Sequence, residues 1–249
     1  MGLLNKLGQA IGAHAVKESD RALPTTRHSS SGNGGIAATG THREPKMPEL
    51  TRVSNALKEF LWNLDGLGRG SLLDMGPASQ TTLSFFIERG FRVTSEDILR
   101  GWADFLVEEE KKLKGPMTAE DYAERTPETL AKRFLDDNLK YRPGTFDAML
   151  LWDTLDYLEP KLAKETVAHL TEMVRPGGVV FALFHSKKPE SFQRYRVMDT
   201  NTLQVLETKV IVPAQKVYQN REIQEMFGRY RTIKSYVGRD QLRESLFIK

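Results

Sequence analysis

Hydrophobic positions in residues 49–249 follow two alternating patterns, short apolar runs and apolar residues at helical spacing. Short uninterrupted runs are typical of strands buried on both faces of a parallel sheet, whereas apolar residues three and four positions apart are typical of helices packed on such a sheet. The runs lie at residues 71–74, 91–95, 146–152 and 179–184. The helical spacing lies at residues 50–64, 83–87, 99–140 and 163–174. The pattern therefore predicts an α/β domain in which strands and helices alternate.

The last third of the chain departs from this alternation. Residues 195–212 have the composition of extended, partly exposed segments, and residues 220–230 again show helical spacing. Two further strands are expected at residues 231–237 and 242–248. We therefore expect a doubly wound, mostly parallel sheet with helices on both faces and an antiparallel C-terminal hairpin at one edge.

The N-terminal part of the chain has a different character. Residues 19–48 include the small, polar run SSSGNGG and are expected to form a disordered linker. Before the linker, residues 1–18 contain an amphipathic pattern over residues 3–16. A frayed or disordered tail and a helix that docks on a membrane surface or a partner both fit this pattern. The folded domain is expected to span residues 49–249.

Net charge is concentrated in the tail and not on the folded domain. Residues 1–48 hold six Lys and Arg and three Asp and Glu, and the whole chain has 36 and 33. The rest of the chain thus carries 30 of each sign, which disfavours nucleic-acid binding. The chain has no cysteine, and only His169 and His185 fall in the domain, so no metal site is expected. No apolar run is long enough to span a bilayer, and we expect a cytoplasmic protein.

Polar residues directly follow three of the predicted strands. These segments are DMGPA at residues 74–78, ED at 96–97 and WD at 152–153. In doubly wound sheets, ligands bind at the carboxyl ends of the strands, where the strand order reverses. The glycine lets a ligand approach the backbone, the next helix offers free amide groups, and a carboxylate at 96–97 can accept hydrogen bonds from a ribose. The three segments together predict a nucleoside-shaped crevice.

These segments resemble class I S-adenosylmethionine-dependent methyltransferases from about Ser71 to the C-terminus. In that family the first strand ends in an acidic-x-Gly-x-Gly loop, whose opening DMG matches, and the second strand ends in an acid that binds the ribose. DDNLKYRPGTFD at 136–147 resembles the segment before the family's fourth strand, and VRPGG at 174–178 resembles the turn before its fifth. The resemblance implies a Rossmann-like fold and S-adenosyl-L-methionine as the cofactor.

The same resemblance assigns cofactor-binding roles to particular residues. They are Asp74, Met75, Gly76, Pro77, Ala78, Glu96, Asp97, Asp136, Asp137, Trp152 and Asp153. In these terms Asp97 binds the ribose, with Glu96 as the alternative, and Asp136 or Asp137 meets the adenine amino group. The chain departs from the family at Ala78, where a second glycine is common, and Pro77 stiffens the same loop.

Methyl transfer from a sulfonium needs aligned reactants and exclusion of water, and it needs a base only where the acceptor must lose a proton. The candidates for that base are His185, Asp153 and Asp156. Arg194 and Arg196 flank Tyr195 in a region where this fold often builds substrate contacts; they suit an acidic acceptor, or a solvated edge strand. The helical insert at residues 99–140 is expected either to cover the cofactor as a lid or to belong to the core.

Each acidic candidate also has a purely structural interpretation, such as a helix cap, a turn or an exposed charged pair. Two functions therefore stay open. One is an S-adenosylmethionine-dependent methyltransferase for a small-molecule or protein acceptor. The other is a methyltransferase-like binding or scaffold module whose tail recruits a partner or a membrane surface. A nicotinamide-dependent enzyme is disfavoured, because GPASQT at residues 76–81 lacks the Gly-x-Gly-x-x-Gly run.

Overall fold

The computed structural model describes residues 50–116, 118, 125–208, 212–238 and 240–249. The helix predicted at residues 3–16 and the linker predicted at residues 19–48 lie outside these residues. Within the described part of the chain, no helix is both long and apolar enough to cross a membrane.

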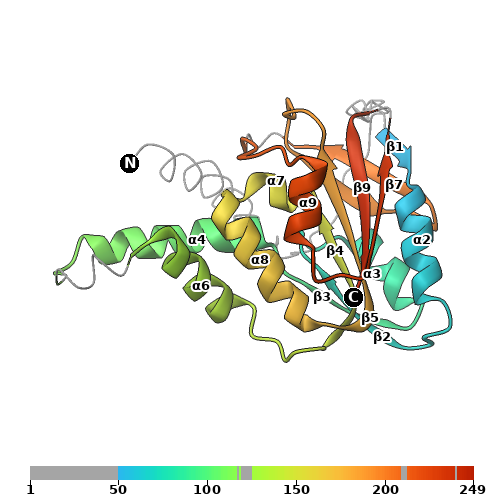
Figure 1. The fold of residues 1–249 in the computed structure, drawn as a ribbon, viewed down its shortest axis with the longest axis horizontal. Coiled ribbons are helices and arrows are strands. Elements are labelled where there is room, and N and C mark those ends of the chain that lie inside the picture. The colour runs from blue at the N-terminus through green and yellow to red at the C-terminus, as the bar shows by residue number, and fades with distance from the viewer. Residues whose placement is uncertain (1–49, 117, 119–124, 209–211, 239) are drawn as a thin grey trace, which may run out of the picture.

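A six-stranded mixed sheet forms the centre of the molecule (Figure 1). In spatial order its strands are β3 (Phe91–Ser95), β2 (Gly70–Asp74), β4 (Phe146–Trp152), β5 (Val174–His185), β9 (Leu242–Ile248) and β8 (Thr232–Val237). The first four are parallel, β9 is antiparallel to β5, and β8 is antiparallel to β9. The predicted parallel sheet with an antiparallel C-terminal hairpin is confirmed.

The strand order reverses around β2. The chain leaves β2 to form β3 on one side of it, and then returns, through a connection whose described part contains two helices, to form β4 on the other side. Leu72 in β2 consequently pairs with Val93 of β3 and with Ala148 of β4. Connections that diverge from neighbouring parallel strands leave a crevice at the carboxyl ends of those strands. In this sheet that place is the end of β2 and β4.

Helices cover both faces of the main sheet, and alternate side chains of its strands belong to different clusters. Leu73 and Met149 pack with α4 (Ile98–Leu113), α6 (Pro127–Asn138), α7 (Thr154–Tyr157), α8 (Pro160–Met173) and α9 (Asn220–Met226). Leu72 and Leu150 pack on the opposite face with α2 (Asn55–Leu64) and α3 (Gln80–Ile87). Figure 1 shows α8 and α9 on one side of the sheet and α2 on the other. Burial on both faces explains why these strands are continuous apolar runs in the sequence.

The helix predicted at residues 50–64 is wrong at its start. Leu50–Val53 forms a strand, β1, and α2 begins only at Asn55. Ser54 separates the two elements, since its hydroxyl accepts a hydrogen bond from the amide of Leu57 at 3.0 Å and so caps the helix. Val53, one of the apolar residues whose spacing predicts a helix there, is 67% exposed.

A second, antiparallel sheet of three strands was not predicted. Its order is β1–β7–β6, where β6 is Gln193–Val197 and β7 is Thr202–Glu207. We call it the small sheet. It packs on the same face of the main sheet as α2 and α3, through Tyr195, Val197 and Leu203. The sequence predicted only extended segments over residues 195–212, because the partner strand β1 lies far away along the chain.

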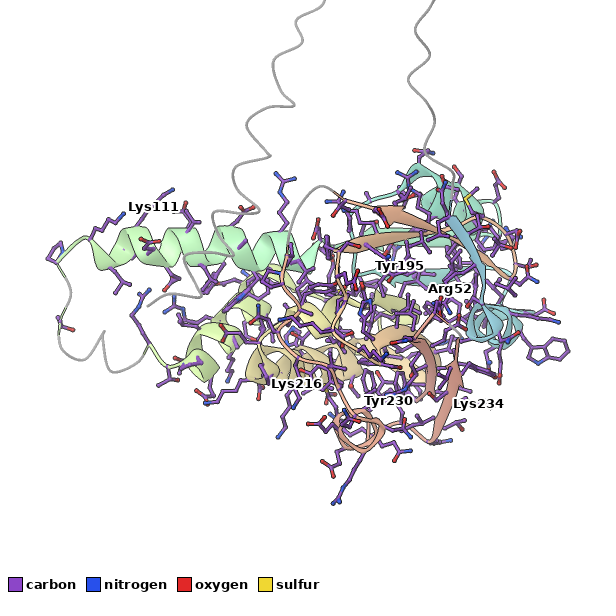
Figure 2. The ribbon with its side chains drawn as sticks, turned by 90° about the horizontal axis from the view of Figure 1, so that it is seen from above. Arg52, Lys111, Tyr195, Lys216, Tyr230 and Lys234 are labelled. Carbon is purple, nitrogen blue, oxygen red and sulfur yellow. The ribbon has the colours of Figure 1, made fainter. Side chains whose placement is uncertain are left out.

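A buried ion pair joins the small sheet to the main sheet. Nη2 of Arg52 in β1 lies 2.9 Å from Oε1 of Glu244 in β9, and both side chains are largely buried. Oε2 of Glu244 also accepts a hydrogen bond from the amide of Ala56 at 2.9 Å. One carboxylate therefore connects β1, the first turn of α2 and β9. Figure 2 shows Arg52 and Tyr195 on this side of the molecule, far from Lys111 near the free end of α4.

The helical insert predicted at residues 99–140 is present as α4 and α6, which project beyond the sheet (Figure 1). Near the sheet, Trp102 and Phe134 pack edge to face with ring centroids 5.1 Å apart. Farther out, the buried carboxylate of Glu109 lies 2.8 Å from Arg125 and 2.5 Å from Arg133. The near part of the insert is core, and an ion-pair cluster holds its outer part together.

Candidate functional site

A pocket of about 290 Å³ lies at the carboxyl ends of β2 and β4. Its walls come from the loop after β2, the start of α4, the end of β4 and the small sheet. The lining residues are Met75, Gly76, Pro77, Ala78, Ser79, Asp97, Leu99, Arg100, Trp152, Asp153, Thr154, Phe192, Gln193, Arg194, Tyr195, Arg196, Leu206 and Val212. The pocket thus occupies the reversal point of the strand order, the place at which the sequence predicted a crevice.

The carboxylate of Asp74, predicted to bind the cofactor, is hydrogen-bonded to other groups of this chain. Its Oδ1 accepts a hydrogen bond from Trp152 Nε1 at 2.6 Å and another from the amide of Gly76 at 3.2 Å. The side chain is buried and is not among the residues that line the pocket. Burial raises the pKa of Asp74 to about 7. In this arrangement Asp74 holds its own loop, which is the structural interpretation that the sequence left open.

The indole of Trp152 takes the place above Gly76 at which a ligand was expected to approach. A Cβ atom at Gly76 would lie 2.9 Å from Trp152 Cδ1, closer than packed carbon atoms approach one another. Trp152 has a left-handed backbone conformation with φ of 50°, which is rare for a bulky residue. Its ring also stacks on Tyr195, with centroids 6.0 Å apart and planes 13° apart. Position 76 therefore has to be glycine in order to leave room for the indole ring, whether or not a ligand binds.

Ser79 is a pocket residue to which the sequence assigned no role. It occupies the N-cap position of α3, but its side chain makes no capping hydrogen bond. Its Oγ is buried and has no hydrogen-bond partner among the described residues. A buried hydroxyl without a partner costs free energy, so this atom is suited to a ligand group or a water molecule. The feature of the sequence that could have identified Ser79 is its position as a polar residue directly before α3.

The two acids after β3 have different environments. Asp97 lines the pocket and also caps α4, because its Oδ1 accepts a hydrogen bond from the amide of Arg100 at 3.2 Å. Glu96 instead accepts a hydrogen bond from the hydroxyl of Tyr141 and is not a lining residue. Of the two alternatives for the ribose, only Asp97 borders the pocket.

Asp136 and Asp137, predicted to meet the adenine amino group, are not brought to the pocket. Both are exposed residues in the last turn of α6. Asp137 lies 3.5 Å from the ammonium group of Lys140, and Asp136 lies 4.0 Å from a ring nitrogen of His169. In this structure the two residues therefore form the exposed charged pair that the sequence left open as their structural interpretation.

The three candidates for a base form one buried cluster. Oδ2 of Asp156 accepts a hydrogen bond from the backbone amide of His185 at 2.7 Å, and it lies 3.0 Å from Nδ1 of the same residue. The other ring nitrogen of His185, Nε2, lies 3.8 Å from Oδ2 of Asp153. The histidine thus lies between two carboxyl groups, and only Asp153 borders the pocket.

Burial controls the ionisation of this cluster. It raises the pKa of Asp153 to about 7, and it also raises the pKa of Asp156. The hydroxyl of Tyr195 donates a hydrogen bond to Asp153 Oδ2 at 3.3 Å, while burial and the nearby Asp153 charge raise the pKa of Tyr195. At neutral pH the pocket therefore contains a carboxyl group that can either hold or release a proton, beside a phenol that stays protonated.

Asp156 also has a structural role that its sequence position did not indicate. Its backbone oxygen accepts hydrogen bonds from the amides of Gln215 and Lys216, at 2.8 and 3.1 Å. The side chain is fully buried and does not reach the pocket. Among the described residues, no group of three or more His, Asp or Glu side chains is arranged to hold a metal ion.

No family model and no curated protein sequence matches this chain. Solved structures do match it. One is the 1,6-didemethyltoxoflavin-N1-methyltransferase of Burkholderia thailandensis, with bound 1,6-didemethyltoxoflavin and S-adenosylhomocysteine, at 16% identity over 79% of each chain and a TM-score of 0.41. Another is a SAM-dependent methyltransferase from Archaeoglobus fulgidus, at 11% identity over 78% of this chain and 91% of that one, with a TM-score of 0.47.

The topology of the main sheet decides the fold class. Four parallel strands are followed by a hairpin whose last strand, β9, inserts antiparallel between β5 and β8. Helices cover both faces, and the pocket lies where the strand order reverses between β2 and β4. The chain therefore has a Rossmann-like fold, a doubly wound, mostly parallel sheet with an antiparallel C-terminal hairpin.

Proposed function

We propose that this protein is a methyltransferase that uses S-adenosyl-L-methionine to methylate a small-molecule or protein acceptor. The observation that carries the proposal is the pocket at the strand-order reversal, with Asp97 in its wall. A carboxylate at the end of the second parallel strand is placed to accept hydrogen bonds from both hydroxyls of a ribose.

The residues present fit this cofactor. The volume of about 290 Å³ is close to the lower end of the range of roughly 300–1,000 Å³ typical of ligand pockets. Ser79 Oγ is a buried hydroxyl in the wall without a hydrogen-bond partner among the described residues. Pro77 and Ala78 are both lining residues of the pocket. The methyl group of Ala78, at the position where the family often has a second glycine, therefore does not close the pocket.

When bound, S-adenosyl-L-methionine supplies a methyl group activated by the sulfonium. The chain's own residues hold and orient the reactants. Asp97 binds the ribose, the loop at residues 75–79 follows the rest of the nucleoside, and Trp152 and Tyr195 close the pocket against water. Asp153, whose pKa is about 7, accepts the proton that a hydroxyl or amine acceptor must lose. Asp156 holds the ring of His185, whose other nitrogen lies 3.8 Å from Asp153 and positions it.

A binding or scaffold module is the second candidate. The observation in its favour is the indole of Trp152, which covers Gly76 and engages Asp74. If the indole stays there in solution, the backbone of the glycine loop is shielded from a ligand. The two candidates differ in one measurable property, the binding of a nucleoside cofactor.

Calorimetric titration of S-adenosylhomocysteine separates the two. We expect the wild type to bind, and Asp97→Asn to bind at least about tenfold more weakly, because hydrogen bonds to a charged acceptor contribute roughly 1.5–3 kcal/mol. Asparagine is the better test than alanine, since it caps a helix as well as aspartate does and so preserves the start of α4. Asp137→Asn, on the exposed face of α6, is the matched control and should bind as the wild type does.

Two results would contradict the proposal. The absence of heat with the wild type would exclude the methyltransferase function and favour the scaffold. Equal affinity of Asp97→Asn and the wild type would remove the ribose role of Asp97. Weaker binding by Asp137→Asn would instead return the adenine role to the end of α6.

A further inference from the structure

Resting on the proposed function, we propose that the methyl acceptor carries an oxyanion group, a carboxylate or a phosphate, that Arg194 and Arg196 bind at the mouth of the pocket. The body of the acceptor then lies against the apolar lining of the pocket, which includes Leu206 on the same face of the small sheet as Arg194. In this arrangement the small sheet selects the acceptor, whereas the loop after β2 and Asp97 bind the cofactor.

The register of the small sheet brings the two arginines together. Arg194 and Arg196 are two positions apart on β6, so their side chains leave the same face of the strand. Both line the pocket, as does Leu206, which is the cross-strand partner of Arg194 on β7. In the part of the chain that the structure describes, β6 is an edge strand of its sheet.

Among the described residues, the two guanidinium groups form no ion pair, in contrast to other arginines of the fold. Arg52 and Arg125 each bind a buried carboxylate, Glu244 and Glu109 respectively. Within the described part of the chain, neither Arg194 nor Arg196 lies within 4.0 Å of a carboxylate. Paired guanidinium groups with free donors are suited to binding an oxyanion, with up to two parallel hydrogen bonds from each.

The charge of the pocket favours an anion over a cation. Arg100 adds a third guanidinium to the lining, and its contact with Asp104, at 3.8 Å between two exposed side chains, is weak. Against these cations stand Asp97, which the proposed function assigns to the ribose, and Asp153. Burial raises the pKa of Asp153 to about 7, which reduces its negative charge at neutral pH.

The remaining lining suits an apolar, planar acceptor body. Trp152 and Tyr195 stack with an angle of 13° between their planes, and Phe192, Leu206 and Val212 add apolar surface. Tyr195 stands between the two arginines on β6, so its side chain leaves the opposite face of the strand, where its hydroxyl donates a hydrogen bond to Asp153. The arginines and the group that would take the proton thus border the pocket from opposite faces of the same strand.

Benzoate and benzyl alcohol are probes that differ in the oxyanion only. Their affinities would be measured by ligand-observed NMR titration of the full chain saturated with S-adenosylhomocysteine. We expect the wild type to bind benzoate more tightly than benzyl alcohol, and the double variant Arg194→Gln/Arg196→Gln to bind benzoate at least about tenfold more weakly with benzyl alcohol unchanged. Arg221→Gln, an arginine 89% exposed on α9, is the matched control. Equal binding of benzoate by the wild type and the double variant would overturn the proposal.

The cofactor also carries a carboxylate, and a second pair of probes separates the two sources of the anion. S-adenosylhomocysteine has the amino-acid carboxylate, and 5′-methylthioadenosine lacks it. If the arginines serve the acceptor, the double variant binds both nucleosides as the wild type does. A selective loss of S-adenosylhomocysteine affinity would assign the arginines to the cofactor and overturn the inference, while leaving the proposed function intact. A wild type that binds neither nucleoside would overturn both.

Discussion

The left-handed backbone of Trp152 shows how a single residue shapes the candidate site. A φ of 50° costs about 1–2 kcal/mol for a residue with a side chain. Three contacts offset this cost: the hydrogen bond to Asp74, the stack on Tyr195 and the packing of the ring on Gly76. The conformation turns the indole from the end of β4 across the end of β2, so it forms one wall of the pocket.

Gly76→Ala is expected to destabilise the protein by about 1–3 kcal/mol, because the added Cβ would lie 2.9 Å from Trp152 Cδ1. The cost should fall in the background of Trp152→Leu, whose smaller side chain can give way. A double-mutant cycle by urea unfolding measures this coupling. Gly101→Ala is the control, since its Cβ would meet Phe134 at an ordinary 3.5 Å and helix propensity favours alanine. Additive costs at positions 76 and 152 would contradict the prediction.

Asp74 is expected to make stability depend on pH. Burial raises its pKa to about 7, above the value of about 4 in an unfolded chain. The folded protein therefore binds a proton that the unfolded chain releases, and the contribution of this group to the free energy of unfolding falls as the pH rises from about 4 to 7.

Asp74→Asn removes this dependence, because asparagine can still accept the hydrogen bond from Trp152 but cannot ionise. We expect the stability of the variant relative to the wild type to increase by roughly 1–3 kcal/mol between pH 5 and pH 8, in urea unfolding at both values. The exposed Asp137→Asn should show no such change. A constant difference between Asp74→Asn and the wild type at the two pH values would argue against a raised pKa.

At the scale of elements, one buried carboxylate adds a polar link between the small sheet and the main sheet. Glu244 binds Arg52 of β1 and the amide of Ala56 in α2. We expect Glu244→Ala to lower the free energy of unfolding by about 3 kcal/mol, since it leaves the buried guanidinium of Arg52 with only the half-exposed carboxylate of Asp240, 3.4 Å from its Nη1. Glu225→Ala removes an exposed ion pair with Arg221 and should cost no more than about 0.5 kcal/mol. Similar costs for the two variants, measured by urea unfolding, would show that Arg52 finds another partner.

At the scale of the whole molecule, the pocket lies between two sheets, so a ligand should stabilise both. At a concentration about 100 times Kd, a ligand raises the free energy of unfolding by about 2.7 kcal/mol. For a protein of this size we expect S-adenosylhomocysteine to raise Tm by roughly 5–10 °C. Hydrogen exchange should also slow in the amides of β6, whereas α9, outside the pocket, serves as the internal control. An unchanged Tm would contradict cofactor binding.

The predictions for the N-terminal residues 1–48 also concern the whole molecule. We expect deletion of residues 1–48 to leave Tm unchanged, because the sequence predicts no core residue there. Co-sedimentation of the full chain and of a variant lacking residues 1–18 with anionic liposomes decides between a docking helix and a free tail. Equal pelleting of the two would exclude membrane docking by residues 3–16.

Part of the fold could be predicted from the sequence because its signals are local. A strand buried on both faces must be apolar throughout, so FDAMLLW and VVFALF identify β4 and β5 without any knowledge of their neighbours. The order of the acidic and glycine segments after these strands similarly predicted the position of the pocket. It also predicted three candidates for a base that the structure brings together in one cluster.

The rest of the fold depends on contacts between residues that are distant along the chain. The sequence predicts helix over β1 because Val53 continues the apolar spacing of Leu57 and Phe60, and only the pairing with β7 determines that residues 50–53 form a strand. Asp74 was assigned to a ligand, and only the fold brings the indole of Trp152 to its carboxylate. The sequence by itself determined the alternation of strands and helices and the place of the crevice, since both follow from local periodicity and chain order. Tertiary structure decided which polar side chains face that crevice, because contacts across the sheet depend on strands that meet only in the folded protein.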